Sequence, residues 1–208
     1  MGRTSDADTR LKDAALELIW EESYGGVSVD DICNRAGVKK GSFYYFFKSK
    51  AELAVAALEH TWQHSWKAKM DSFFSSSSAP LDRLSNYLAS IYTVQVESKQ
   101  EHGRVLGCSI CSIGSEISTQ EHDVNAKARE ILATKRKYVE SAIRDAIAEG
   151  LIEACDPSEK ALAVSALIDG ITAQARINND PEIAKHLPAM AMSLFTFKKT
   201  PAPLPVSA

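Results

Sequence analysis

The sequence lacks a hydrophobic stretch long enough to cross a membrane, because no apolar run among its 208 residues approaches the roughly 18 residues that a spanning helix needs. It also lacks the apolar segment of a secretory signal, since its first ten residues, MGRTSDADTR, are polar almost throughout. Cysteine is scarce, with only Cys33, Cys108, Cys111 and Cys155, so we expect reduced thiols and no disulfide framework. These absences together predict a cytoplasmic protein that does not bind a membrane.

Motifs of the common enzyme classes are also missing. The sequence contains no phosphate-binding loop, no nucleophile elbow and no HExxH zinc motif. Hydrophobic residues make up 45% and charged residues 25% of the chain, as in ordinary globular proteins. We therefore expect a folded protein that is not an enzyme and that has no cofactor and no metal.

Acidic residues are missing from one part of the chain. The formal net charge is -3, yet residues 33–50 carry five basic side chains, Arg35, Lys39, Lys40, Lys48 and Lys50, and no acidic one. Residues 1–32 carry eight acidic and three basic side chains. A basic segment within an acidic protein is typical of a localised contact with a polyanion, although a solvated basic surface gives the same pattern.

The hydrophobic periodicity predicts an all-α protein of about nine helices. We expect helices over residues 5–23, 28–35, 38–47, 49–74, 81–99, 108–118, 123–149, 157–177 and 181–197. The helix over 157–177 is apolar on more than one face, so we expect it to be buried all round. Pro188 is expected to kink the last helix unless the helix is broken there.

Two of the short helices have the spacing of a helix-turn-helix. The sequence Ser28-Val29-Asp30-Asp31 predicts a capping box at the start of the first helix. Ala36-Gly37 predicts the tight turn between this helix and the next one. The basic segment therefore lies within a candidate DNA-binding motif.

Residues Val27–Leu53 resemble the N-terminal signature of the TetR family of transcriptional regulators. The matching positions are Ser28, Ile32, Ala36, Gly37, Val38, Gly41, Phe43, Tyr44, Phe47, Lys50 and Leu53. Cys33 departs from the signature, since the family usually has alanine there. The resemblance implies an N-terminal three-helix DNA-binding domain at 1–50 and an effector-binding and dimerisation domain at 51–200. The proline-rich composition of the last residues predicts a disordered tail at 201–208.

The resemblance further implies a homodimer that binds a palindromic operator of double-stranded DNA and is released by a small-molecule effector. On the predicted recognition helix we expect base contacts from the side chains of Lys39, Lys40, Ser42, Tyr44 and Tyr45. Phosphate contacts are expected from the side chains of Ser28, Lys48 and Lys50. The three phenylalanines of the segment, Phe43, Phe46 and Phe47, are expected to build the domain core.

The effector site is less clearly marked in the sequence. Its candidate residues are Trp62, Trp66, Met70, Tyr87, Tyr92, Cys108, Cys111 and Tyr138, which ordinary core packing also explains. The Cys108-Ser-Ile-Cys111 pair has three interpretations: a buried packing pair, a redox or electrophile sensor, and a metal site with His102 or His122. The function predicted is a ligand-responsive repressor. The alternatives are a redox-sensing repressor acting through Cys108 and Cys111 and a helical small-molecule-binding protein without DNA function.

Overall fold

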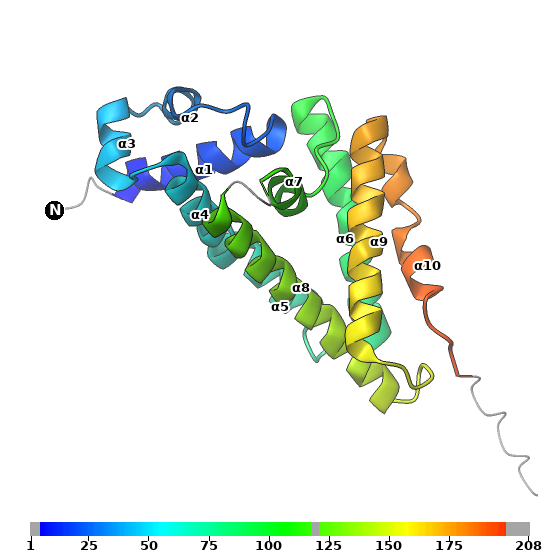
Figure 1. Cartoon of the computed structure of the whole chain (residues 1–208). Coiled ribbons are helices and arrows are strands. Elements are labelled where there is room, and N and C mark those ends of the chain that lie inside the picture. Colours follow the sequence, from blue (N-terminus) through cyan, green and yellow to red (C-terminus); the bar gives the residue numbers. More distant parts are fainter. Residues whose placement is uncertain (1–4, 118–120, 199–208) are drawn as a thin grey trace, which may run out of the picture.

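The computed structural model describes residues 5–117 and 121–198, and its regular elements are almost all helices (Figure 1). The helices are α1 (Ser5–Glu21), α2 (Val29–Ala36), α3 (Lys40–Phe46), α4 (Lys50–Thr61), α5 (Lys67–Phe73), α6 (Pro80–His102), α7 (Ser109–Glu116), α8 (His122–Ala148), α9 (Pro157–Asn178) and α10 (Leu187–Met192). A π-helical turn, η1 (Trp62–Trp66), joins α4 to α5, and a 3-10 turn, η2 (Pro181–Ala184), precedes α10.

These elements confirm the all-α prediction. If α4, η1 and α5 are counted as one continuous helix, the described residues hold nine α-helices, as the periodicity predicts. Outside the helices, the backbone of the described residues forms a single isolated β-bridge, between Ile152 and Phe197. No helix in the described ranges is long and apolar enough to cross a membrane.

The N-terminal helices form a small unit at one end of the molecule. Helices α1, α2 and α3 lie together, and α1 packs along α4, which leads into the rest of the chain (Figure 1). The core of this unit contains the fully buried side chains of Leu11, Ile32, Phe43 and Leu53. Helices α1, α2 and α4 therefore supply the apolar side chains that pack with α3 in this core.

The remaining helices form a larger unit. Helix α8 runs beside α4 and α5, while α6, α9 and α10 stand together on the far side (Figure 1). Helix α7 lies between the two groups and contacts both α8 and α1. This short helix therefore joins the N-terminal unit to the larger one.

The prediction of one last helix over residues 181–197 is wrong. The chain forms η2, then breaks, and α10 begins at Leu187 with Pro188 in its first turn. Proline is tolerated in a first turn because the amide hydrogen that it lacks has no partner there. The break removes the kink that Pro188 would otherwise impose.

The expectation that α9 is buried all round is also wrong for the single chain. Leu162 near its start is 53% exposed and Ile177 near its end is 74% exposed. Leu162 and Ile177 therefore lie on apolar surface that the chain itself does not cover. Two other expectations, the end of the helix over 108–118 and the tail at 201–208, fall on positions outside the described residues.

Candidate nucleic-acid interface

The turn between α2 and α3 has the geometry that the sequence predicts. Ser28 caps α2, accepting a hydrogen bond from Asp31 N, and the Asp31 carboxylate accepts one from Ser28 N at 2.9 Å, which confirms the capping box. Gly37 ends α2 in the left-handed conformation, with φ 62° and ψ 39°. This conformation favours glycine and redirects the chain, so that α3 begins three residues later.

The inner face of α3 is anchored in the core. Phe43 is 0% exposed and its ring contacts that of Phe47, which is also buried, with ring centroids 6.1 Å apart. Phe46 is half-buried and packs against the same core. The expectation that the three phenylalanines build the core is thus confirmed for Phe43 and Phe47, while Phe46 lies at its edge.

The outer face of α3 carries two tyrosines in solvent. Tyr44 is 56% exposed and Tyr45 is 75% exposed. Each ring packs edge-on against a neighbouring phenylalanine, Tyr44 on Phe43 at 5.0 Å and Tyr45 on Phe46 at 4.9 Å between centroids. Both rings therefore project into solvent from a helix whose other face is anchored in the core. Burying these aromatic rings would stabilise the fold, so their exposure indicates a role in binding and not in packing.

Cationic and hydroxyl side chains surround these tyrosines. Lys39 is the exposed N-cap residue of α3, Ser42 is half-buried, and Lys48 follows the helix in an exposed position. Within the described residues, the ammonium groups of Lys39 and Lys48 have no hydrogen-bond or ion-pair partner. These two charges are thus free to meet an anion from outside the protein.

Lys40 has an acidic partner that the sequence analysis missed. Its ammonium group lies 2.8 Å from Oδ1 of Asp30 on α2, and this ion pair raises the pKa of Lys40. Asp30 belongs to the acidic segment that precedes the basic one, and only the folding of α2 against α3 brings the two together. A carboxylate therefore stands at the edge of the basic surface.

Lys50 and Arg35 have contacts within the protein. The Lys50 ammonium donates to the carbonyls of Tyr24 at 2.7 Å and Val27 at 2.9 Å, and it lies 4.3 Å from the centre of the Tyr24 ring. Burial lowers the pKa of Lys50. Arg35 pairs with Glu17 and Glu21 of α1, each at 3.1 Å. Two of the five charges in the basic segment thus hold helices and loops together.

The candidate effector residues fall into several groups. Trp62, Met70 and Tyr87 are buried in the core, and Trp66 packs partly against it. Phe74 links two of the predicted residues, lying 5.3 Å from the ring centre of Tyr87 and 5.6 Å from that of Tyr138. The Tyr92 hydroxyl lies elsewhere and donates to Glu182 of η2 at 2.5 Å.

The two cysteines of α7 lie beside charged groups from α8 and α9. Cys111 donates to Asp169 Oδ1 at 2.9 Å. Hydrogen bonding to Cys111 lowers the pKa of Cys108, with help from the charge of Lys135, while burial acts in the opposite direction. The Cys111 hydrogen serves one acceptor at a time, and sharing it with Cys108 raises the pKa of Cys111 itself. No sequence pattern pointed to Lys135 or Asp169.

The metal interpretation of the cysteine pair finds no support in the structure. His102 pairs with Glu21 at 3.1 Å, and His122 lies near Asp123 at 3.4 Å on the surface. In the ranges 5–117 and 121–198, no group of three histidine, cysteine or acidic side chains is placed to hold a metal ion.

Comparison with known proteins extends the resemblance along most of the chain. Residues 11–57 match the family described as bacterial regulatory proteins, tetR family, and residues 80–190 match the tetracyclin repressor-like C-terminal domain. The transcriptional regulator AcuR of Cereibacter sphaeroides is 30% identical over 171 residues, which cover 81% of this chain and 76% of AcuR. The transcriptional repressor NemR of Escherichia coli K12 is 24% identical over 189 residues, covering 88% of this chain and 91% of NemR.

Solved structures agree with this assignment. The regulatory protein TetR from Rhodobacter sphaeroides superposes with a TM-score of 0.81 at 29% identity and covers 92% of this chain and 100% of its own. The reduced form of E. coli NemR has the same fold, with a TM-score of 0.80 at 21% identity, covering 94% of this chain and 100% of its own. These matches favour neither the redox-sensing alternative nor the alternative without DNA function. The chain belongs to the TetR family of bacterial regulatory proteins and is a ligand-responsive DNA-binding transcriptional regulator.

Proposed function

We propose that the protein is a repressor that reads a palindromic operator with α3 in the major groove. The observation that carries this proposal is the pair of exposed rings, Tyr44 and Tyr45, on a helix whose other face is anchored by the fully buried Phe43. A short, rigid helix with an exposed polar and aromatic face fits the major groove, where lysine donates to guanine and rings contact thymine methyl groups. We assign base contacts to Lys39, Lys40, Ser42, Tyr44 and Tyr45.

Phosphate contacts fall to fewer groups than the sequence predicts. Lys48 is exposed with a free ammonium group and is the main phosphate contact that we assign. Ser28 at the exposed N-terminus of α2 is retained as a second contact, although its amide and hydroxyl donate to the Asp31 carboxylate in the single chain. Lys50 is assigned a different role, because its ammonium group already donates to Tyr24 and Val27. We infer that Lys50 supports the operator contact indirectly, by holding the loop before α2.

A homodimer through α9 and α10 follows from the apolar surface that one chain leaves open. Leu162 and Ile177 of α9 and Met190 of α10 are exposed in the single chain. A second copy that covers these side chains would remove them from water, and a two-fold axis would present two copies of α3 to one DNA duplex. The proposed domain division is 1–50 for DNA binding and 51–200 for effector binding and dimerisation.

The proposed effector site lies in the larger unit, around Tyr87, Cys108 and Cys111. Lys135 and Asp169 add charge to this otherwise apolar region, and a few polar groups among apolar side chains are typical of a small-molecule site. Tyr138 is connected to it through Phe74, and Trp62, Trp66 and Met70 belong to the neighbouring core. Tyr92 is assigned outside the site because its hydroxyl binds Glu182 on η2.

Selection from a library of duplexes with a randomised central region tests the proposed function. We expect rounds of binding and amplification to enrich a two-fold symmetric sequence whose half-sites lie about one helical turn, or about 34 Å, apart. Binding without enrichment of any sequence would contradict operator recognition. Enrichment of a single, unrepeated half-site would contradict the dimeric mode of binding.

A further inference from the structure

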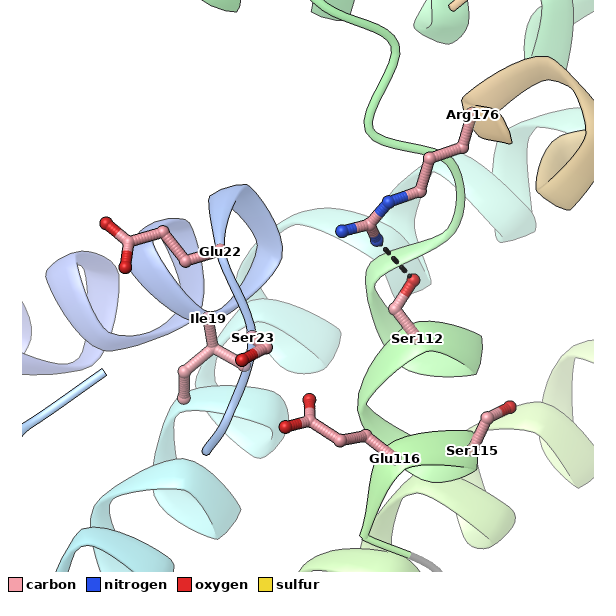
Figure 2. Close-up of a pocket in the computed structure, with 7 residues that line it drawn as sticks. All are labelled: Ile19, Glu22, Ser23, Ser112, Ser115, Glu116 and Arg176. Carbon is pink, nitrogen blue, oxygen red and sulfur yellow. Dashed lines mark hydrogen bonds between the residues drawn. The ribbon is translucent and has the colours of Figure 1, made fainter. Parts of the chain in front are cut away.

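Tyr24 lies in the loop between α1 and α2, and its backbone is held by two other helices. Its amide donates to Glu116 Oε2 of α7 at 2.8 Å, and its carbonyl accepts a hydrogen bond from the Lys50 ammonium of α4 at 2.7 Å. Figure 2 shows the Glu116 side chain on α7 directed toward the chain that leaves α1 at Ser23. Tyr24 is therefore a point at which the larger unit contacts the loop that leads into the helix-turn-helix.

The hydroxyl group of Tyr24 is buried without a partner. Tyr24 is 5% exposed, and the Lys50 ammonium lies 4.3 Å from the centre of its ring. Within the described parts of the chain, this hydroxyl is the one buried side-chain nitrogen or oxygen that has no hydrogen-bond partner. Burying a hydroxyl group without a hydrogen bond is unfavourable, so an arrangement in which an acceptor reaches it gains stability.

A carboxylate that suits this hydroxyl belongs to α8. Glu121 is the N-cap residue of α8, and its side chain makes no capping hydrogen bond to the described amides of that helix. Burial and then the charge of Glu121 raise the pKa of Tyr24 to about 12, and the charge of Glu121 also opposes the burial that lowers the pKa of Lys50. Tyr24 is therefore a protonated donor at neutral pH, beside a carboxylate that is not used to cap α8.

We propose that Tyr24 is a positioning residue for DNA binding, whose hydroxyl donates to the Glu121 carboxylate when the protein binds DNA. The donor and the acceptor lie on different units, so a small shift of the N-terminus of α8 toward the loop forms the bond. The bond fixes the loop, and with it the N-terminus of α2, against the larger unit. DNA favours this arrangement because a contact surface that is already held in place loses less conformational freedom on binding.

Helix α8 connects this contact to the proposed effector site. Lys135, which adds charge to that site, lies on the same helix as Glu121, about 21 Å away along the axis at a rise of 1.5 Å per residue. An effector that shifts α8 along its axis therefore makes or breaks the bond to Tyr24. This consequence rests on the proposed effector site, whereas the role of Tyr24 in DNA binding does not.

Tyr24→Phe removes only the hydroxyl, and duplexes of random sequence test its effect without relying on a palindromic operator. We expect the Kd measured by fluorescence anisotropy to rise at least about three-fold, since one hydrogen bond of the complex is lost. The slope of log K against log salt concentration should not change, because no cationic side chain leaves a phosphate. An unchanged Kd, or a flatter slope, would overturn the proposal.

Thermal unfolding separates positioning from a structural role. In the free protein the hydroxyl has no partner among the described residues, so the Tm of Tyr24→Phe should equal or exceed that of the wild type. Tyr92→Phe is the matched control, since it removes a hydroxyl that donates to Glu182 within the larger unit, and it should leave the Kd for DNA unchanged. A Tm of Tyr24→Phe more than about 3 °C below that of the wild type would overturn the proposal, because the free protein would then already use the hydroxyl.

A double-mutant cycle identifies the acceptor. Glu121→Ala should weaken DNA binding about as much as Tyr24→Phe does, and the double variant should bind no more weakly than either single variant. Glu149→Ala removes the same charge from the exposed C-terminal end of α8 and should leave the Kd within about two-fold of the wild type. Additive effects of Tyr24→Phe and Glu121→Ala on the Kd would overturn the assignment of Glu121 as the acceptor.

Discussion

At the scale of single residues, the partner of Lys40 affects how strongly the basic surface attracts DNA. Its ammonium group pairs with the carboxylate of Asp30 on α2, at the edge of the proposed DNA-binding surface. The pair orients Lys40, and the carboxylate opposes binding of any duplex irrespective of its sequence. We therefore infer that Asp30 lowers the affinity for DNA of any sequence and so raises the preference for the operator over other DNA.

Asp30→Asn is expected to strengthen binding to random duplex DNA about five-fold, because a carboxylate leaves the interface and Lys40 becomes free for phosphates. The plot of log K against log salt concentration should become steeper by about one unit. Fluorescence anisotropy at several salt concentrations measures both quantities. Asp82→Asn, an exposed change on α6, is the control, and weaker or unchanged binding by Asp30→Asn would refute the role given to this residue.

Lys48 and Lys50 lie two positions apart and are expected to respond differently to alanine. Lys50→Ala removes two hydrogen bonds to buried carbonyls, so the free energy of unfolding in urea should fall by about 1–3 kcal/mol. Lys48→Ala should leave that free energy within about 0.5 kcal/mol and flatten the salt dependence of DNA binding by about one unit. A flatter salt dependence in Lys50→Ala, with a loss of stability in Lys48→Ala instead, would show that Lys50 is the phosphate contact.

At the scale of elements, α7 connects the two units alongside α4, which packs against both α1 and α8. Glu116 near its end binds the loop before α2, and Cys111 near its start binds Asp169 of α9. The chain just before α7 adds further contacts, since Leu106 O accepts hydrogen bonds from both Trp20 of α1 and Arg176 of α9. A movement of α7 would therefore change contacts in both units.

Glu116→Ala is expected to release the loop at Tyr24 and Gly25. Their amide hydrogens lose the acceptor that Glu116 provides, so hydrogen exchange at both should become at least about ten-fold faster. The amide of Gly26 is an internal control, because it donates to Ser23 Oγ and not to Glu116. Unchanged exchange at Tyr24 and Gly25 would mean that Glu116 does not hold this loop.

The elements differ in how far the sequence predicts them. Local signals fixed α2 and the turn after it, because the cap at Ser28 and the left-handed Gly37 depend on neighbouring residues alone. Pro188 marked the break before α10 as the alternative to a kink, whereas the hydrophobic periodicity contains no signal for the π-turn η1 inside a long helix. The pairing of Asp30 with Lys40 was missed because it requires two helices to be in place.

At the scale of the whole molecule, the proposed dimer depends on the exposed side chains of α9. Leu162 and Ile177 are exposed at opposite ends of α9, a helix that is otherwise rich in apolar residues. We base the proposed interface between copies on these two side chains together with Met190 of α10.

The double variant Leu162→Glu/Ile177→Glu is expected to weaken dimerisation at least about ten-fold, because burying two unpaired carboxylates is costly. Sedimentation at about 10 μM should give a dimer for the wild type, because a stable dimer has a Kd well below this concentration. The variant should show a larger monomer fraction. Ser76→Glu, in the exposed loop after α5, should sediment as the wild type does. A wild-type monomer at this concentration would refute the dimer and the palindromic operator with it.

The most direct test of recognition by α3 is the ratio between the affinity for the selected duplex and the affinity for a scrambled duplex of equal length. For Tyr44→Ala/Tyr45→Ala, we predict that this ratio falls at least about ten-fold, since each lost base contact costs about 1–3 kcal/mol, while the affinity for the scrambled duplex changes less than about two-fold. The free energy of unfolding should stay close to that of the wild type, because both side chains are exposed. An unchanged ratio in the folded variant would contradict the claim that α3 reads the operator.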